Sequence, residues 1–144
     1  MRVALGSDMK GDLPEAIARW LAAHGHQVDL FGALRPGGGE EWPSVGRAVA
    51  SAVAAGEADY GVLCCWTGTG VSIAANKVAG ARAALCGDAA TAAGAREWND
   101  ANVLCISLRA TSLPVAEEIL AAWFASSPTT DPAFRAMIDA MRNS

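Results

Sequence analysis

Near its middle the chain contains the run Tyr60-Gly61-Val62-Leu63-Cys64-Cys65-Trp66-Thr67-Gly68-Thr69-Gly70-Val71-Ser72. The apolar first part of this run predicts a buried strand at residues 60–64, and a helix near residues 71–77 follows a glycine-rich turn. A second apolar run at residues 81–86 predicts another strand. Strands joined through a helix run parallel, because a right-handed crossover returns the chain to the same edge of the sheet. The run therefore predicts one unit of a parallel α/β sheet.

The same alternation continues toward both ends of the chain. Further strands are expected at residues 2–5, 27–31 and 103–106, and further helices at residues 13–24, 43–55, 89–97, 113–124 and 132–141. This order predicts an α/β fold, a three-layer α/β/α sandwich with a doubly wound, Rossmann-like parallel sheet of five strands. Because no linker interrupts the pattern, we expect a single domain over residues 1–144.

The amino-acid composition indicates which kinds of binding partner and which cellular location are expected for the protein. Hydrophobic residues make up 52% of the 144 residues and charged residues 18%, which suggests apolar surface hidden in a subunit contact. The 11 basic residues are scattered among 15 acidic ones, for a net charge of -4, which argues against nucleic acid as a partner. Charges and glycines interrupt every apolar stretch, so no membrane span is expected. The four cysteines lie in or beside apolar runs, which is typical of a reducing, cytoplasmic location.

Candidate chemistry lies directly after the predicted strands, because ligands of such folds bind outside the carboxyl ends of the strands. Gly68 and Gly70 allow a sharp turn whose amides, with the start of the next helix, suit a phosphate or an oxyanion. That positive field would favour a thiolate at Cys65, the form that can act as a base. Two plainer interpretations remain open at this point: an inert buried thiol and an ordinary glycine turn.

The segments around this turn resemble a known family. Residues 61–77 and 80–86 closely resemble the signature of the type B ribose-5-phosphate isomerase and galactose-6-phosphate isomerase family, and the resemblance extends to residues 4–8, 57–59 and 95–104. It implies a sugar-phosphate isomerase that interconverts an aldose and a ketose without a metal or cofactor. It also implies homodimers, possibly tetramers, with active sites between two subunits. The helix within residues 131–144 is then expected to pack on the partner subunit.

The resemblance also implies roles for individual residues. Cys65 matches the base that moves a proton between C1 and C2 through a cis-enediolate, and Thr67 matches a neighbour that helps to place the sugar. Asp8 matches a carboxylate that holds sugar hydroxyls, and Asn99 a polar residue near the enediolate. The remaining matches are the oxyanion-binding amides of Gly68, Gly70, Val71 and Ser72, and the phosphate-binding side chains of Arg109 and Arg135.

Several positions depart from the family pattern, which marks the chain as a divergent member. Met9 and Trp98 stand where the family has histidines, one that contacts phosphate and one that is assigned to opening the sugar ring. Trp66 replaces a glycine and Trp42 a tyrosine, while Arg135 lacks a second arginine one turn later. An indole cannot shuttle the ring-opening proton. These changes favour a substrate that is already open-chain, such as a four-carbon keto sugar phosphate, or one whose ring opens unaided. A ribose 5-phosphate-like substrate remains the other option.

Two other functions compete with isomerisation. A non-catalytic protein that binds a sugar or sugar phosphate would explain the missing histidines, although the retained Cys65 and Thr67 argue against it. A nucleotide-binding module would need a glycine fingerprint after the first strand. The residues there, Gly6-Ser7-Asp8-Met9, do not supply one.

Overall fold

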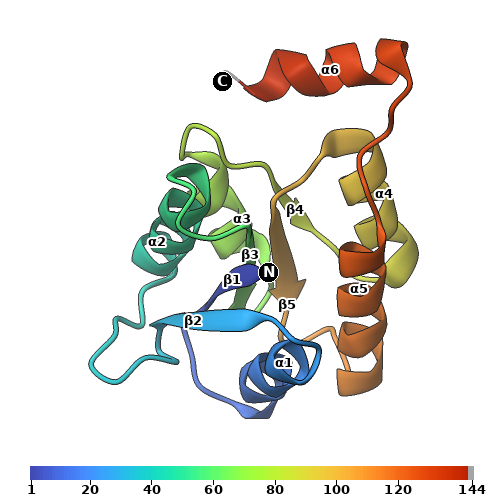
Figure 1. Cartoon of the computed structure of the whole chain (residues 1–144). Helices are drawn as coiled ribbons and strands as arrows, with labels where there is room; N and C mark the ends of the chain where they lie inside the picture. The colour runs from blue at the N-terminus through green and yellow to red at the C-terminus, as the bar shows by residue number, and fades with distance from the viewer. Residues whose placement is uncertain (143–144) are drawn as a thin grey trace.

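The computed structural model describes residues 1–142, which form a five-stranded sheet between two layers of helices (Figure 1). The strands are β1 (Arg2–Ser7), β2 (Gln27–Gly32), β3 (Tyr60–Cys65), β4 (Ala83–Leu85) and β5 (Val103–Ser107). The helices are α1 (Asp12–Ala23), α2 (Trp42–Ala54), α3 (Thr69–Asn76), α4 (Ala89–Asn99), α5 (Leu113–Ala125) and α6 (Pro132–Arg142). The predicted α/β sandwich is confirmed, and the last two residues of the predicted segment 131–144 lie outside the described residues.

All neighbouring strands run parallel, in the order β2-β1-β3-β5-β4. The chain passes from β1 to β2 on one side and then crosses back to place β3 on the other side of β1. The point between β1 and β3 is therefore the topological switch of the sheet, where connections leave in opposite directions. Strand β4 is shorter than the predicted 81–86, because the backbone of Arg82 pairs with the Asn102 side chain before regular pairing begins.

Each face of the sheet has its own apolar core, and alternate residues of a strand enter opposite cores. One core gathers Ile17 of α1, Ala92 of α4 and Leu120 of α5 beneath one face. The other holds Val49 of α2 and Val71 of α3 beneath the opposite face. Neighbouring cysteines of β3 separate accordingly, with Cys64 in the first core and Cys65 in the second.

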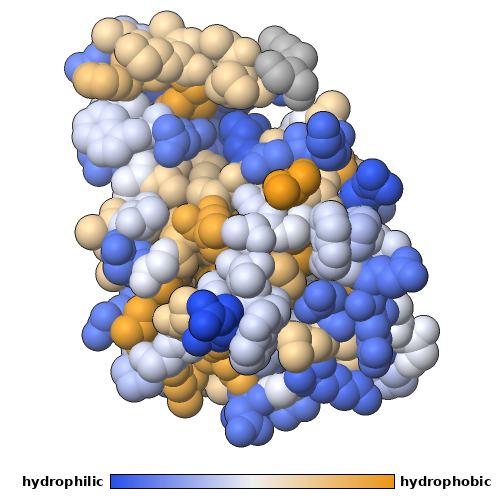
Figure 2. All heavy atoms as spheres, turned by 180° about the vertical axis from the view of Figure 1, so that it is seen from behind, coloured by the Kyte–Doolittle hydropathy of each residue, from blue (hydrophilic) through white to orange (hydrophobic). Residues whose placement is uncertain are grey.

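Helix α6 stands apart from the sandwich and lies across the amino-terminal ends of the strands (Figure 1). Buried Ile138 anchors it, together with an ion pair from Arg142 to Asp100 at 2.9 Å and the Trp98–Phe134 ring contact at 5.0 Å. Met137 and Met141 are exposed and line a cleft beneath the helix together with Ile138. Figure 2 shows this end of the molecule, at the top, covered with pale orange, moderately hydrophobic atoms.

The four cysteines are all free thiols. Among the helices of residues 1–142, none combines the length and the apolar character needed to cross a membrane.

Candidate active site

Cys65 and Asp8 meet at the switch point of the sheet. Ser7 of β1 lies opposite Cys64 of β3, so the residues that follow them, Asp8 and Cys65, leave the sheet side by side. The Asp8 amide extends the ladder by one weak bond to the Cys64 carbonyl at 3.4 Å. Two residues predicted to act together are therefore neighbours, although they are 57 positions apart in the sequence.

Asp8 carries an unsatisfied oxygen. Its Oδ1 atom is buried yet has no hydrogen-bond partner among the described residues. Burial raises the pKa of this carboxyl group, an effect opposed in part by a hydrogen bond from its own backbone amide. Because a buried acceptor without a donor is costly, this oxygen is suited to accept a hydrogen bond from a ligand hydroxyl.

Cys65 ends β3 directly before the glycine-rich turn, with 5% of its surface exposed. The other thiols lie in different settings. Burial raises the pKa of Cys64 to about 12 and that of Cys86 to about 11, and it also raises the pKa of Cys105. These three groups therefore stay protonated near neutral pH.

The glycine-rich turn leads into a helix without a side-chain cap. Gly68, the N-cap residue of α3, has a left-handed backbone with φ of 75°, and no side chain bonds the first amides of the helix. The helix begins at Thr69, two residues earlier than predicted, so the amide of Ser72 already donates to the Gly68 carbonyl at 3.4 Å. The Ser72 amide, which was expected to bind the oxyanion, thus has a partner within the helix. Because the helix was predicted to start near residue 71, the amide of Thr69 was not expected at the site. Together with the amides of Gly70 and Val71, it is a free donor in the first turn of α3.

Side chains crowd the rim of this turn. The Trp42 ring lies over Gly70, where a β-carbon would come within 2.9 Å of the indole. Trp66 is 56% exposed beside the thiol, and the Thr67 hydroxyl is bonded to that of Thr69 at 2.7 Å. The Trp42 ring therefore borders the start of α3.

The turn after β5 joins the site from the other side. The amides of Leu108 and Arg109 donate to the carbonyls of Cys65 and Trp66 at 3.0 and 2.9 Å. The Arg109 side chain is exposed and has no ion-pair partner within residues 1–142. Arg109 thus lies at the same edge of the sheet as Cys65 with its charge free for a ligand.

Asn99 and Arg135 lie at the opposite edge. Asn99 ends α4 near the start of β5, and Arg135 belongs to α6, whereas Cys65 is at the far end of β3. A strand rises about 3.3 Å per residue, which separates the two edges by roughly 16 Å over the six residues of β3. Within one chain the structure does not bring these two residues to the thiol.

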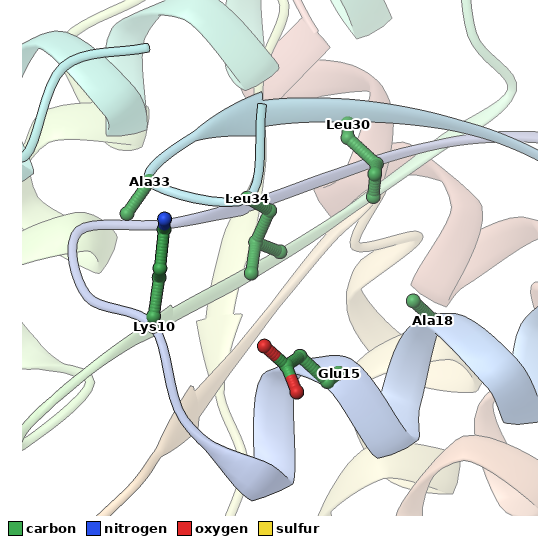
Figure 3. A pocket seen from close by; sticks show the side chains of 6 residues that line it. All are labelled: Lys10, Glu15, Ala18, Leu30, Ala33 and Leu34. Atoms are coloured by element: carbon green, nitrogen blue, oxygen red, sulfur yellow. The ribbon is translucent and has the colours of Figure 1, made fainter. Parts of the chain in front are cut away.

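Neither of two clefts found within residues 1–142 is lined by Cys65. One, of about 290 Å³, lies between α1 and β2 with Lys10 and Glu15 at its mouth (Figure 3). The other, of about 680 Å³, lies under α6 and is lined by residues that include Arg82, Trp98 and Asn99. Within residues 1–142, no three or more His, Cys, Asp or Glu side chains gather closely enough to hold a metal ion. Cys65 itself is 5% exposed and belongs to the core beneath α2 and α3.

An open parallel sheet, with a carboxylate, a thiol and an uncapped helix at its switch point, defines an α/β protein with a small-molecule site at the carboxyl edge. Comparison with known proteins makes this class specific. The chain belongs to the Ribose/Galactose Isomerase family, whose model matches residues 3–138. The predicted family resemblance is confirmed, and the chain is an aldose–ketose isomerase of the sugar-phosphate isomerase type.

Individual relatives support this membership. Galactose-6-phosphate isomerase subunit LacB of Clostridium acetobutylicum is 39% identical, with 83% of this chain and 69% of the relative covered. D-erythrulose-4-phosphate isomerase of Pectobacterium atrosepticum is 36% identical, with 85% and 82% covered. The structure of ribose-5-phosphate isomerase B from Clostridium thermocellum superposes with a TM-score of 0.90 at 36% identity, with 99% of this chain and 95% of that chain covered.

Proposed function

We propose that the protein isomerises a short, open-chain sugar phosphate, with Cys65 as the base. The observation that carries this proposal is the convergence at the switch point of three groups: the Cys65 thiol, the unsatisfied Asp8 oxygen and the uncapped amides of α3. A base, a hydroxyl acceptor and an oxyanion site are what proton transfer next to a carbonyl requires.

The reaction follows from these positions. The Cys65 thiolate removes a proton from the carbon beside the carbonyl, and the electron pair of that C–H bond forms a cis-enediolate. The amides of Thr69, Gly70 and Val71 stabilise the negative oxygen through the positive end of α3. The thiol then returns the proton to the adjacent carbon, while the hydroxyl proton of the enediolate passes from one oxygen to the other. Asp8 accepts a hydrogen bond from a substrate hydroxyl, and Thr67 helps to orient the sugar.

A candidate ligand for the substrate's phosphate lies in the same chain as the thiol. Arg109 offers an unpaired guanidinium at the edge that carries Cys65. Guanidinium groups bind phosphate oxygens in a bidentate manner, which positions the reacting carbons as well as supplying affinity. We assign the second contact to Arg135 of a neighbouring subunit.

The size and form of the substrate follow from the altered positions. Trp98 cannot open a sugar ring, and Met9 offers no cation for phosphate. The indole of Trp42 occupies space beside Gly70 at the start of α3, and the exposed Trp66 directly follows Cys65 in the chain. A four-carbon keto sugar phosphate cannot form the five- or six-membered ring of a longer phosphorylated sugar, and it fits the reduced space. The name of the Pectobacterium relative, D-erythrulose-4-phosphate isomerase, supports this choice.

A homodimer completes the site in this proposal. Each chain has exposed apolar groups at both edges: Trp98, Phe134, Met137 and Met141 around α6, and Met9, Trp42, Trp66 and Leu85 around Cys65. A two-fold axis can pack the α6 edge of one copy against the thiol edge of the other. That pairing would cover both surfaces and bring the partner's Asn99 and Arg135 to the edge that carries Cys65.

The experiment is isotope exchange in heavy water with open-chain and cyclic sugar phosphates of four to six carbons. We expect deuterium at the carbon next to the carbonyl, fastest with the four-carbon ketose phosphate. Cys65→Ser should abolish exchange, because a serine hydroxyl is too weak an acid to provide the base. Cys86→Ser, which changes a buried thiol at the end of another strand, should retain it.

Each alternative has its own outcome in this experiment. Binding of a sugar phosphate without any exchange would identify the non-catalytic binding protein. Equally fast turnover of ribose 5-phosphate would contradict the proposed substrate while leaving the isomerase assignment intact. Exchange that survives in Cys65→Ser would move the base to another residue.

A further inference from the structure

The turn that follows β5 holds the loop that carries the thiol. Besides the bonds from the amides of Leu108 and Arg109, the Ser107 hydroxyl donates to the Trp66 carbonyl at 3.1 Å. The same Ser107 oxygen accepts a hydrogen bond from the Ala110 amide at 3.2 Å. The Ala110 amide therefore fixes the Ser107 hydroxyl, which in turn holds the loop that follows Cys65. The Trp66 carbonyl accepts two hydrogen bonds, one from the Arg109 amide and one from the Ser107 hydroxyl.

These bonds change the direction of two successive peptide groups. In a parallel strand, the carbonyls of consecutive residues point to opposite neighbours. Here the carbonyl of Cys64 still points toward β1, where it accepts the Asp8 amide, but the carbonyls of both Cys65 and Trp66 point toward the end of β5. If the carbonyl directions had continued to alternate as in a regular strand, the Trp66 carbonyl would point toward β1.

The amides on the other side of these peptide groups then face the site. Peptide groups are planar and, within residues 1–142, all trans, so each N–H points opposite to the carbonyl of the preceding residue. The N–H groups of Trp66 and Thr67 therefore both point away from β5, toward the β1 side where Asp8 lies. No hydrogen-bond acceptor is found for either amide within the described part of the chain. Successive amides aimed at one point form an anion-binding concavity.

We infer that Ser107 is a positioning residue, whose hydroxyl holds the Trp66–Thr67 peptide group so that its amide faces the developing oxyanion. This inference rests on the isomerase function proposed above. The space around Gly68 supports a close contact between the loop and the end of β5, because a β-carbon added at Gly68 would lie 3.0 Å from the Ser107 backbone nitrogen. The loop and the end of β5 thus pack directly on each other, and the hydroxyl is part of that contact.

The test compares Ser107→Ala with Ser112→Ala. Ser112 caps α5 by accepting a hydrogen bond from the Val115 amide, so both variants lose a serine hydroxyl that bonds the backbone near the surface. We expect Ser107→Ala to lower kcat about tenfold with KM within twofold, because the lost alignment matters in the transition state. Ser112→Ala should leave both constants within twofold of wild type. A kcat for Ser107→Ala within twofold of wild type would overturn the inference.

Amide hydrogen exchange tests the same contact without any substrate. In Ser107→Ala the amides of Arg109 and Ala110 should exchange with solvent faster than in wild type, while those in the core of β3 stay unchanged. Unchanged exchange at Arg109 and Ala110 would show that the hydroxyl does not hold the loop. If the wild-type protein isomerises no sugar phosphate, the proposed function fails by itself, and the exchange measurement still decides whether the contact exists.

Discussion

At the scale of single residues, Asp8 combines a buried, unpaired oxygen with a pKa raised above its ordinary value of 3.8 by burial. A carboxyl group whose pKa is higher in the folded state binds its proton more tightly there. Stability is therefore fullest below the unfolded pKa and is lost as the pH rises from about 3.8 through the raised pKa. The carboxylate needed for function is thus a cost to the fold at neutral pH.

The first prediction follows from the direction in which the raised pKa of Asp8 makes stability depend on pH. Asp8→Asn should have a higher Tm than wild type near pH 7, and the gain should shrink as the pH falls toward 4, while isomerase activity decreases. Thermal unfolding over this pH range measures the effect. Glu117→Gln, on the exposed side of α5, serves as the control and should show no such gain. A Tm difference independent of pH would refute the account of Asp8.

A second prediction separates two effects of replacing Gly68 by alanine, the strain of a left-handed backbone and the steric overlap of an added β-carbon. Gly25 and Gly68 both have left-handed backbones, with φ of 83° and 75°, but only at Gly68 would a β-carbon meet neighbours, the nearest at 2.5 Å. Gly25→Ala should lower the free energy of unfolding by about 1 kcal/mol through backbone strain alone. Gly68→Ala should lower it by about 3 kcal/mol, because steric overlap is added. Urea denaturation measures both, and equal losses would show that the Leu85 side chain and the end of β5 yield.

At the scale of elements, Arg96 ties α4 to the sheet. Its side chain is 3% exposed and donates to the Tyr60 hydroxyl at 2.7 Å, the Ala101 carbonyl at 2.6 Å and Asp100 at 3.0 Å. Arg82 pairs with the same carboxylate at 3.5 Å but is more exposed. The helix therefore depends on one buried cation that connects it to β3 and to the chain just before β5.

The third prediction compares these two arginines. Arg96→Leu should lower the free energy of unfolding by about 3 kcal/mol, because it leaves several buried polar groups without partners. Arg82→Leu should cost about 1 kcal/mol, since water can replace its contacts. Chemical denaturation of both variants provides the measurement. A larger loss for Arg82→Leu than for Arg96→Leu would contradict this account of how α4 is held.

At the scale of the whole molecule, the fourth prediction concerns a site shared between subunits. Cys65→Ser and Arg135→Ala should each be nearly inactive as homodimers. Dimers formed from an equal mixture should recover about a quarter of wild-type activity, because half are mixed and each mixed dimer contains one intact site. Refolding the variants together and separately gives the comparison. No recovery in the mixture would place Arg135 and Cys65 in the site of the same chain or in none.

A fifth prediction tests the contact surface itself. Met137→Glu places a charge at a position 63% exposed in the single chain but covered in the proposed dimer, so it should yield monomers without isotope exchange. Leu113→Glu, at an exposed apolar position of α5, should leave the dimer intact. Light scattering measures the mass in solution. A Met137→Glu protein that stays dimeric would remove α6 from the interface.

The order of elements was predictable because local patterns carry it. Alternating apolar runs and helical periods place every strand and helix, and Gly68 marks the turn before α3. Two element boundaries were harder to predict from the sequence. Helix α3 starts at Thr69 because the left-handed backbone of Gly68 lets the helix begin directly after it. Strand β4 is short because the Asn102 side chain bonds the Arg82 backbone. Both depend on contacts with segments that the local pattern does not include.

By itself, the sequence determined the parallel α/β architecture, the family, and the candidate thiol after the third strand. Hydrophobic periodicity and short motifs are local, so they survive without knowledge of the fold. Tertiary structure alone decided that Asp8 keeps an unpaired oxygen, that Ser107 holds the loop carrying Cys65, and that Asn99 and Arg135 lie at the far edge of the sheet. These features depend on which strand ends meet in space, and strand order is set by packing between segments distant in the chain.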